Sequence, residues 1–307
     1  MRRDDRGFAL VVVLLVLALV SVVGAEFAYS MRLEAAAVRA YKNGVIAGHL
    51  AETGVEQAIR EIVADSARVG EDDDGRLTFY DKSGAPLPRL PRDQVEFGGG
   101  QYSYRITDEE GRLNLNSASP DRVDRLLLAL GLEKSLRDTI VDSLQDWKDA
   151  NEEHRLNGAE SEDTYLKRPV PYRAKNGNLD SATELLQIKG VTPALFHGEK
   201  DRPGLAAYVT ARGPTQVNMN TADAPVLRAF GLSDAEISEV VQTRRSAPYA
   251  QVPGKFGGRN LSVATSTFRI EAEGLVDGRV AARVTAIVQK KAGNPPTLSV
   301  LEWSGLR

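Results

Sequence analysis

The sequence predicts an α+β protein in which one long N-terminal helix lies on an antiparallel sheet and a large helical segment interrupts that sheet. An uncharged apolar run near the N-terminus continues into an amphipathic stretch with helical spacing. Apolar and polar residues alternate around residues 102–106 and again across residues 268–303. Short amphipathic runs, most of them starting near Ser, Asp or Pro, fill the sequence between these two regions.

The composition restricts the classes of function. With 307 residues, 42% of them hydrophobic, the chain can bury one sizeable core or two modest ones. A net charge of -3 argues against a general nucleic-acid binder, because a phosphate backbone would not be neutralised in bulk. The sequence contains no cysteine, which excludes disulfides, thiolate nucleophiles and zinc bound by cysteine.

The N-terminal apolar run is long enough to cross a membrane. It extends over 18 uncharged residues, from residue 8 to residue 25, and such a helix spans ~30 Å of hydrocarbon. Arg2, Arg3 and Arg6 precede the run, and the first carboxylate after it belongs to Glu26. The positive-inside rule therefore predicts a single-pass anchor with a cytoplasmic N-terminus and the remainder of the chain outside.

Three kinds of segment fit this run: a cleaved secretory signal, an uncleaved anchor and a prepilin-type leader. Residues 23–25, Val-Gly-Ala, would pass for a signal-peptidase site. The junction at Gly7 and Phe8 resembles that of type IV prepilins, whose short basic leader is cut after the glycine. Helical spacing continues without proline to about residue 67, for a helix on the order of 90 Å long. This continuation favours the prepilin type, with cleavage between Gly7 and Phe8.

The fifth residue after the predicted cleavage is Val12, where most prepilin-like proteins have glutamate. A carboxylate inside the hydrocarbon costs about 2.5 kcal/mol or more unless it finds a partner. In pilus assembly that partner is the N-terminal amine of the subunit ahead. A subunit with none ahead has no use for the glutamate, so Val12 predicts a position at the tip and argues against a major pilin.

The strand signals lie on both sides of the helical segment. We expect strands at residues 77–80 and 102–106, a hairpin across residues 268–288 that turns at Asp277-Gly278, and a strand at residues 297–303. Residues 70–75 and 84–91 have the composition of a turn and a loop. One antiparallel sheet is expected, because each strand set alone is too small to be stable.

The helical segment contains an internal repeat. Residues 113–118, LNLNSA, match residues 217–222, VNMNTA, and each copy is followed by a helix, Gly-Leu and another helix. Ser117 and Thr221 are expected to cap the first helix of each copy. The expected helical runs are residues 122–130, 135–148, 181–187, 203–209, 224–230 and 233–243.

The densest group of hard oxygen ligands follows one of these runs. Asp146, Asp149 and Asn151 offer three such ligands within six residues, and Glu160 can close the sphere from the loop that also carries Asp163. Calcium takes six to eight oxygen ligands, whereas zinc prefers the His and Cys that are missing here. The spacing alone also fits a solvated acidic loop, because the EF-hand pattern is absent.

Two further patterns resemble functional sites. Residues 184–193 and 241–245 resemble helix-hairpin-helix elements, which bind DNA phosphates through a Gly-apolar-Gly hairpin, but Thr192 replaces the second glycine. Residues 112–261 carry 20 basic and 20 acidic side chains, so structural packing is favoured over a membrane-anchored DNA-binding or uptake protein. For catalysis, His49, His154 and His197 are far apart in the sequence, and the pair Glu160 and Asp163 is not specific. We expect no enzyme activity.

Several of these segments together resemble the general secretion pathway protein K family of type II secretion, whose members are minor pseudopilins. The resemblance covers nearly the whole chain, and its motifs occur in the order found in the family. They are the leader junction without the fifth-position glutamate, DEEGRLNLN at residues 108–116, DWKD at 146–149, NGAE at 157–160 with Tyr165, ELLQIKG at 184–190, and NMNTA at 218–222.

The resemblance implies a pilin-like α+β fold with these domains: a leader at residues 1–7, the helix at 8–68, a β domain at 69–110 and 264–307, and a helical insertion at 111–263. It implies a single-pass anchor in the bacterial inner membrane with the bulk in the periplasm. It also implies a place at the pseudopilus tip, initiating assembly and supporting export of folded exoproteins. The implied partners are minor pseudopilins I, J and H, the inner-membrane assembly platform, a prepilin peptidase with methylation of the new N-terminus, and exoprotein substrates, but no nucleic acid.

The resemblance also bears on the metal. Family members bind calcium in the insertion, which implies a calcium site that includes Asp146, Asp149 and Glu160. Asn151 stands where the family usually has an aspartate. The loss of one charge implies a weaker site in this chain.

Overall fold

The computed structural model describes residues 5–64, 68–72, 75–200, 202–293 and 296–305. Its dominant element is helix α1 (Asp5–Val63), which runs without interruption through Gly24, Gly44, Gly48 and Gly54. It ends at Val63, before the predicted end near residue 68, and residues 65–67 of that prediction lie outside the described part of the chain. From Arg68 onward the chain pairs as strand β1 (Arg68–Glu71) with β2 (Leu77–Tyr80).

The main sheet has five antiparallel strands in the order β13-β12-β11-β4-β3. Asp277 and Gly278 both have positive φ, 53° and 71°, which fits the tight turn predicted between β11 and β12. Two expectations fail: β2 pairs with β1 outside this sheet, and Gly70 and Glu71 belong to β1 instead of a turn. The five strands are β3 (Val95–Phe97), β4 (Gly100–Asp108), β11 (Thr267–Val276), β12 (Arg279–Lys291) and β13 (Thr297–Gly305).

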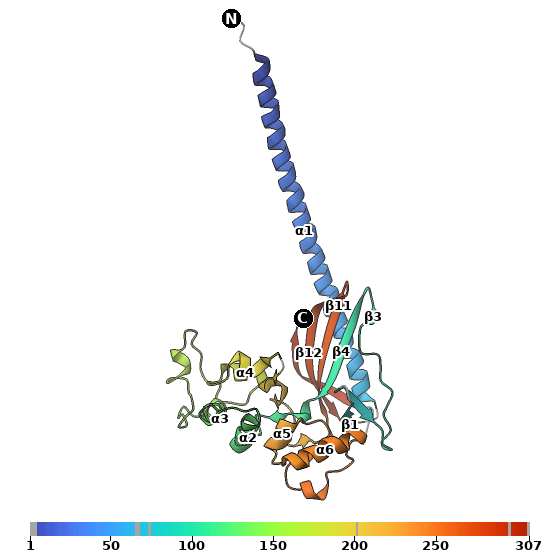
Figure 1. The fold of residues 1–307 in the computed structure, drawn as a ribbon, viewed down its shortest axis with the longest axis vertical. Coiled ribbons are helices and arrows are strands. Elements are labelled where there is room, and N and C mark those ends of the chain that lie inside the picture. The colour runs from blue at the N-terminus through green and yellow to red at the C-terminus, as the bar shows by residue number, and fades with distance from the viewer. Residues whose placement is uncertain (1–4, 65–67, 73–74, 201, 294–295, 306–307) are drawn as a thin grey trace.

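The second half of α1 covers one face of this sheet, whereas the first half projects away from the rest of the molecule (Figure 1). The contact is close because Gly274 of β11 has no side chain: a Cβ there would lie 1.8 Å from the carbonyl oxygen of Ala47. The buried core of this part is formed by α1, β1, β2 and the sheet, and its α1 members are Ala47, Leu50, Ala51, Val55, Ala58 and Ile62.

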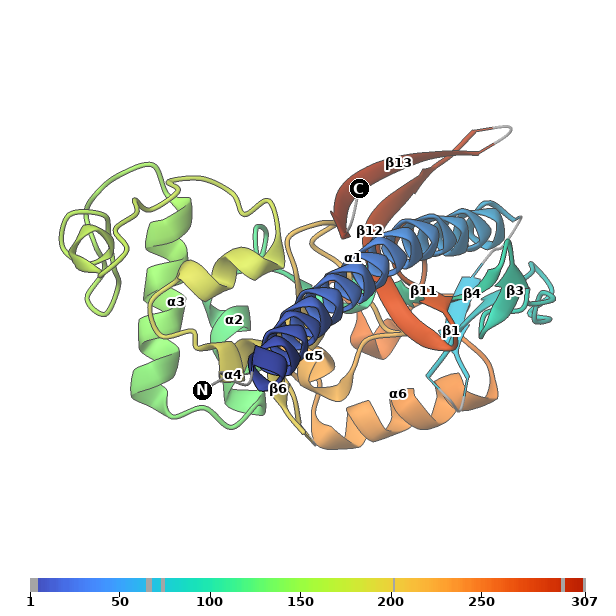
Figure 2. The ribbon, with the colours of Figure 1, turned by 90° about the horizontal axis from the view of Figure 1, so that it is seen from above.

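The segment between β4 and β11 is mainly helical, and it packs beside the sheet and beyond the end of α1 (Figures 1 and 2). Three expectations need correction: residues 182–187 form a 3-10 helix, the run 203–209 holds only a 3-10 turn between two short strands, and α4 was not predicted. The α-helices are α2 (Pro120–Ala129), α3 (Lys134–Lys148), α4 (Pro193–His197), α5 (Ala224–Ala229) and α6 (Asp234–Ser246). The 3-10 helices are η1 (Glu109–Gly111), η2 (Tyr165–Lys167), η3 (Ala182–Gln187), η4 (Leu205–Ala207) and η5 (Gly254–Phe256).

Each copy of the sequence repeat begins with a two-residue parallel strand pair. β5 (Leu113–Asn114) pairs with β8 (Val209–Thr210), and β9 (Val217–Asn218) pairs with β10 (Leu261–Ser262). A separate antiparallel pair, β6 (Gly198–Glu199) and β7 (Arg202–Pro203), lies after α4. Two-residue strands carry no alternation, so the sequence pattern did not reveal them.

The second asparagine of each copy forms hydrogen bonds with the backbone of a later segment of the chain. Asn116 donates from Nδ2 to the carbonyls of Leu179 and Ala211 and accepts from the backbone N–H of Leu179. Asn220 makes the same two-way contact with Tyr249. These bonds satisfy buried backbone groups at the corresponding place in both copies.

The predicted helix caps were wrong by two residues. Ser119 caps α2, with its Oγ accepting from the N–H of Arg122, and Asp223 holds the cap position of α5. Thr221 instead donates its hydroxyl to Asp108. Both helices have a proline in their first turn. Because proline favours the first helical position, each helix starts later than the predicted caps Ser117 and Thr221 require.

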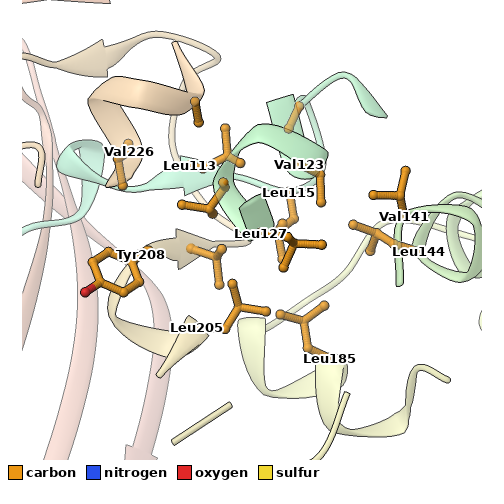
Figure 3. Packing of buried hydrophobic residues seen from close by; sticks show 14 of the residues in the cluster. Leu113, Leu115, Val123, Leu127, Val141, Leu144, Leu185, Leu205, Tyr208 and Val226 are labelled. Carbon is orange, nitrogen blue, oxygen red and sulfur yellow. The ribbon is translucent and has the colours of Figure 1, made fainter. Parts of the chain in front are cut away.

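The helical segment between β4 and β11, called the repeat region below, has its own hydrophobic core, separate from the core beneath α1. Side chains from α2, α3, α5, β5 and the segment around η4 meet there, as Figure 3 shows for Leu113, Leu127, Leu144, Leu205 and Val226. The chain therefore builds two modest cores, one of the outcomes that its composition allows. The exact domain boundaries stay a prediction.

Candidate functional site

The predicted metal site lies where the last turn of α3 meets the loop that follows it. Asp146 is fully buried, and its carboxylate accepts from the backbone N–H of Ala159 at 2.9 Å and of Arg155 at 3.1 Å. Gly158 makes this wrapping possible, because a Cβ on that residue would lie 1.8 Å from Oδ2 of Asp146. The glycine of the NGAE motif is thus required by the carboxylate it surrounds.

Arg155 joins two of the predicted ligands. Its Nη1 lies 2.6 Å from Oδ1 of Asp146 and 2.6 Å from Oδ2 of Asp149. Asn151 is held beside them, because its Nδ2 donates to Asp149 at 2.8 Å. The fold therefore brings Asp146, Asp149 and Asn151 together around a guanidinium, a partner that the spacing of oxygen ligands did not reveal.

Glu160 is the unusual member of the group. Its side chain is 2% exposed, and neither carboxylate oxygen has a hydrogen-bond partner among the described residues. Burial, followed by the negative charge of Asp146, raises the pKa of Glu160 to about 7. A buried carboxylate without a partner costs several kcal/mol, and the neighbouring carboxylates of Asp146, Glu152 and Asp149 add repulsion to that cost.

Asp163 does not point at the same place. Its Oδ1 accepts from the backbone N–H of Glu160 at 2.9 Å, and its Oδ2 lies 3.6 Å from Nδ1 of His154. The contacts fix the conformation of the loop. Asp163 therefore contacts the loop backbone and His154, and it does not contact Arg155 as Asp146 and Asp149 do.

The donor chemistry of this cluster fits a hard cation. The buried, unpartnered Glu160 and the adjacent Asp146 would supply oxygen ligands, which calcium prefers. Within the described ranges, no three His, Asp or Glu side chains are already converged at metal-binding distance. The guanidinium of Arg155 instead balances Asp146 and Asp149, so a calcium ion here stays a prediction.

Three aromatic side chains pack together beside the loop that follows α3. Trp147 packs edge-on against Tyr165 at 5.4 Å, and Tyr165 stacks on Tyr172 at 5.2 Å between ring centroids. The guanidinium of Arg168 lies 5.0 Å from the centre of the Tyr165 ring. Motif spacing singled out Trp147 and Tyr165, but it missed Tyr172 and Arg168, whose positions depend on the fold of the loop.

The junction between the sheet and the repeat region contains a buried acidic run that sequence reasoning did not assign. Asp108 accepts from Nδ2 of Asn218 and the hydroxyls of Thr221 and Thr265, at 2.6–2.7 Å. Its burial raises the pKa of Asp108 to about 6. Hydrogen bonds from β4 thus reach both the second repeat and the approach to β11.

Glu109 continues the junction with the opposite shift. Its carboxylate is buried and accepts two hydrogen bonds from Arg269 of β11, each 2.8 Å, and it also pairs with Arg112. Burial alone would raise the pKa of Glu109, but Arg269 and Arg112 outweigh it and hold the pKa below its usual range. The junction is therefore tied by ionised groups as well as by Asp108.

The resemblance to helix-hairpin-helix elements does not correspond to an open phosphate cradle. Gly190 packs on α3, where a Cβ would lie 2.9 Å from a side-chain carbon of Ile140, and Thr192 caps α4. Residues 241–245 lie in the body of α6, away from a hairpin. Both elements serve helix packing here.

The first half of α1 carries the largest uncovered apolar surface of the described chain. It is the one described helix long and apolar enough to span a membrane. Large apolar side chains remain exposed beyond residue 25, where the predicted span ends: Phe27, Tyr29, Met31, Leu33, Val38, Tyr41 and Val45.

Comparison with known proteins identifies the family of this chain. A family model described as type II secretion system (T2SS), protein K matches residues 107–210. The type II secretion system protein K of Pseudomonas aeruginosa is 28% identical over 95% of this chain and 91% of the relative. That of Pectobacterium carotovorum subsp. carotovorum is 30% identical over 82% of this chain and 79% of the relative. The chain belongs to the type II secretion system protein K family.

A solved structure shows the fold of this family. One chain of the crystal structure of the GspK-GspI-GspJ complex from the enterotoxigenic Escherichia coli type 2 secretion system superposes with a TM-score of 0.62. The match covers 89% of this chain and 99% of that chain at 18% identity. The predicted α+β class, with a long N-terminal helix, an antiparallel sheet and further helices, is confirmed. So is the resemblance to the protein K family.

Proposed function

We propose that this chain is the minor pseudopilin at the tip of the type II secretion pseudopilus, where it initiates assembly and supports export of folded exoproteins across the outer membrane. A prepilin peptidase would cleave it between Gly7 and Phe8. Helix α1 would then anchor it in the inner membrane, with the sheet and the repeat region in the periplasm.

The exposed apolar surface of α1 carries this proposal. Tyr29 is 70% exposed and Leu33 is 61% exposed, although both lie beyond the predicted membrane span. A contiguous apolar surface of this kind marks a site of association. The helices of other pseudopilins offer the same long apolar shape, so they would cover these side chains in a filament.

The tip position rests on two further observations. Val12 supplies no carboxylate for the amine of a subunit ahead. Helices α5 and α6 lie beyond the end of α1 that is farthest from the N-terminus (Figure 1). They would cover the face on which a subunit ahead would stack, which suits the subunit at the tip of a filament.

The proposed partners are minor pseudopilins I and J, together with pseudopilin H, the assembly platform and exoprotein substrates. The similar crystal structure is that of a complex of GspK with GspI and GspJ. We carry these two partners over to this chain because the family is shared and because α1 offers the uncovered surface described above.

Co-purification tests this function. The tagged full chain, co-expressed with the I and J subunits of its own system and extracted in detergent, should retain both, and its mass should correspond to an N-terminus at Phe8. Leu33→Glu should lose both subunits, because it places a charge on the exposed apolar surface of α1. Leu156→Glu, at an equally apolar side chain that is 94% exposed in the repeat region, is the matched control.

Two results would contradict the proposal. One is retention of I and J by Leu33→Glu at the level of the Leu156→Glu control. The other is a mature chain that begins at Ala25 or Glu26, which would assign the apolar run to a cleaved secretory signal.

We also propose calcium at the acidic cluster, with Glu160 and Asp146 as ligands and with Asp149 and Asn151 completing the oxygen set. The cation would neutralise the carboxylate of Glu160, which no described side chain does. Arg155 contacts Asp146 and Asp149 now, so it competes for the same charges. Calcium affinity should therefore be modest.

Glu160→Gln tests calcium better than a change at Asp146, which also holds the loop backbone and would destabilise the chain with or without metal. In chelator, Glu160→Gln should melt at the same temperature as the unchanged chain or higher, because it removes an uncompensated buried charge. In calcium it should melt lower. Glu162→Gln, at an exposed neighbour, should match the unchanged chain in both conditions. A calcium-independent difference for Glu160→Gln would refute the site.

A further inference from the structure

A second polar hollow lies on the repeat region, away from the acidic cluster. It has a volume of about 570 Å³ and is formed by the start of α2, the end of α5 and the segment before β10. Three arginines line it: Arg122, Arg125 and Arg259. The hydroxyl side chains of Ser117, Ser119 and Thr215 line it as well.

Arg122 is held in place by its neighbours. Its guanidinium carbon lies 4.5 Å from the centre of the Phe230 ring, a cation–π contact. With the amide of Asn260 turned so that its oxygen faces Arg122, that oxygen accepts from Nη2 at 3.0 Å. Stacking and this hydrogen bond restrict the side chain, so little rotamer freedom remains to be lost when a ligand binds.

The three arginines differ in how they are balanced. Arg125 pairs with Asp121, and Arg259 pairs with Glu236, each at 2.9 Å. Arg122 has no carboxylate partner within the described part of the chain. The hollow thus contains one ordered guanidinium whose charge is not neutralised, beside two that are.

A planar guanidinium with free N–H groups binds a carboxylate through two parallel hydrogen bonds, and such forked pairs are about twice as strong as neutral hydrogen bonds. We propose that this hollow binds an exposed Asp or Glu side chain of a protein partner, with Arg122 as the residue that contacts the carboxylate. The hydroxyl groups of Ser117, Ser119 and Thr215 are the neighbouring donors.

The surroundings favour a carboxylate on a protein over the phosphates of a nucleic acid. Asp121 and Glu236 stand beside the arginines, so an extended polyanion would meet carboxylates as often as guanidiniums. Across residues 112–261 the basic and acidic side chains are equal in number, which leaves no long-range attraction for a phosphate backbone. A single acidic side chain needs only the local guanidinium and the space around it.

Fluorescence anisotropy with labelled glycine-serine peptides that carry one glutamate or, as the matched control, one glutamine tests the proposal on the full chain in detergent micelles. The unchanged protein should bind the glutamate peptide in preference to the glutamine peptide. Arg122→Lys keeps the charge but loses the fork, so its affinity for the glutamate peptide should fall by about tenfold or more. Arg279→Lys, at an exposed arginine of β12, should bind as the unchanged protein does.

A second pair of variants leaves Arg122 intact. Thr215→Glu places a carboxylate in the hollow from an exposed position and should compete with the peptide, whereas Gln216→Glu adds the same charge at the next exposed position, which does not line the hollow. Equal affinity of all these variants for the glutamate peptide would overturn the proposal. The proposal would also be overturned if single-stranded DNA bound through Arg122 more tightly than the peptide does. Displacement of the peptide by millimolar inorganic phosphate would overturn it too.

Discussion

Asp108 shows how a single carboxylate can join distant parts of this chain. It ends β4, and its partners Asn218, Thr221 and Thr265 are more than 100 residues away in the sequence. Such pairings leave no local pattern, which is why spacing arguments did not mark Asp108 as important. The acidic cluster was easier to predict, because Asp146, Asp149 and Asn151 fall within six residues. Its cation, Arg155, was missed, since a guanidinium is not an oxygen ligand.

Replacing Asp108 by alanine should be strongly destabilising. Four donors would lose their acceptor, among them the backbone N–H of Glu110, and each buried donor left unsatisfied costs about 1–3 kcal/mol. Asp121→Ala removes an exposed carboxylate whose partner is Arg125, one helical turn away, and should cost less than about 1 kcal/mol. Denaturant unfolding of the two variants in micelles measures the difference, and equal losses would show that the junction does not depend on Asp108.

Glu71 predicts a pH dependence at the same junction. Burial raises the pKa of this β1 carboxyl to about 7 from 4.5, although the charge of Arg244 on α6 opposes the shift. The folded state holds the proton more tightly than the unfolded state, so the free energy of unfolding should fall as the pH rises from about 4.5 to about 7.

Glu71→Gln removes this titration. The variant should lose less stability than the unchanged chain across that pH window and should be the more stable of the two above pH 7. The negative charge of Asp108 contributes to raising the pKa of Glu71, so the difference between the two curves reports Glu71 together with its coupling to Asp108. Unfolding curves recorded at several pH values provide the measurement, and parallel pH profiles would refute the assignment.

At the scale of whole elements, the sequence was most informative where a pattern was long. Helix α1 and the hairpin of β11 and β12 follow from sustained helical spacing and from alternation with an Asp-Gly turn. Residues 203–209 have the composition of a helix but form short strands and one 3-10 turn, because β8 pairs with β5 nearly one hundred residues earlier. Tertiary pairing overrode local preference there, as it did at the end of α1.

The contact between α1 and β11 predicts opposite effects for two glycines. Gly274→Ala would place a Cβ 1.8 Å from the carbonyl oxygen of Ala47, so the helix must move and stability should fall by roughly 1–3 kcal/mol or more. Gly44 lies on α1, and no atom lies near the position of its Cβ. Gly44→Ala should therefore raise the free energy of unfolding by about 1 kcal/mol. Thermal unfolding in micelles compares them, and a neutral Gly274→Ala would contradict the close packing of helix and sheet.

At the scale of the molecule, the chain consists of a membrane-length helix, a sheet that supports it and a duplicated helical unit with its own core. The two copies could be recognised from the sequence because their asparagines serve the same backbone contacts in each. The position of this unit beyond the end of α1 could not be recognised, since buried ionic contacts such as that of Glu109 with Arg269 set it. That position supports the proposed place of the molecule at the tip.

Labelling of the filament end tests the tip position most directly. The chain has no cysteine, so Leu156→Cys, at a side chain that is 94% exposed, gives a single site for maleimide-gold. Pseudopili that incorporate this variant, sheared from cells and viewed by electron microscopy, should carry one gold particle at one end. Gold distributed along the filaments, or filaments without any end label, would contradict the account.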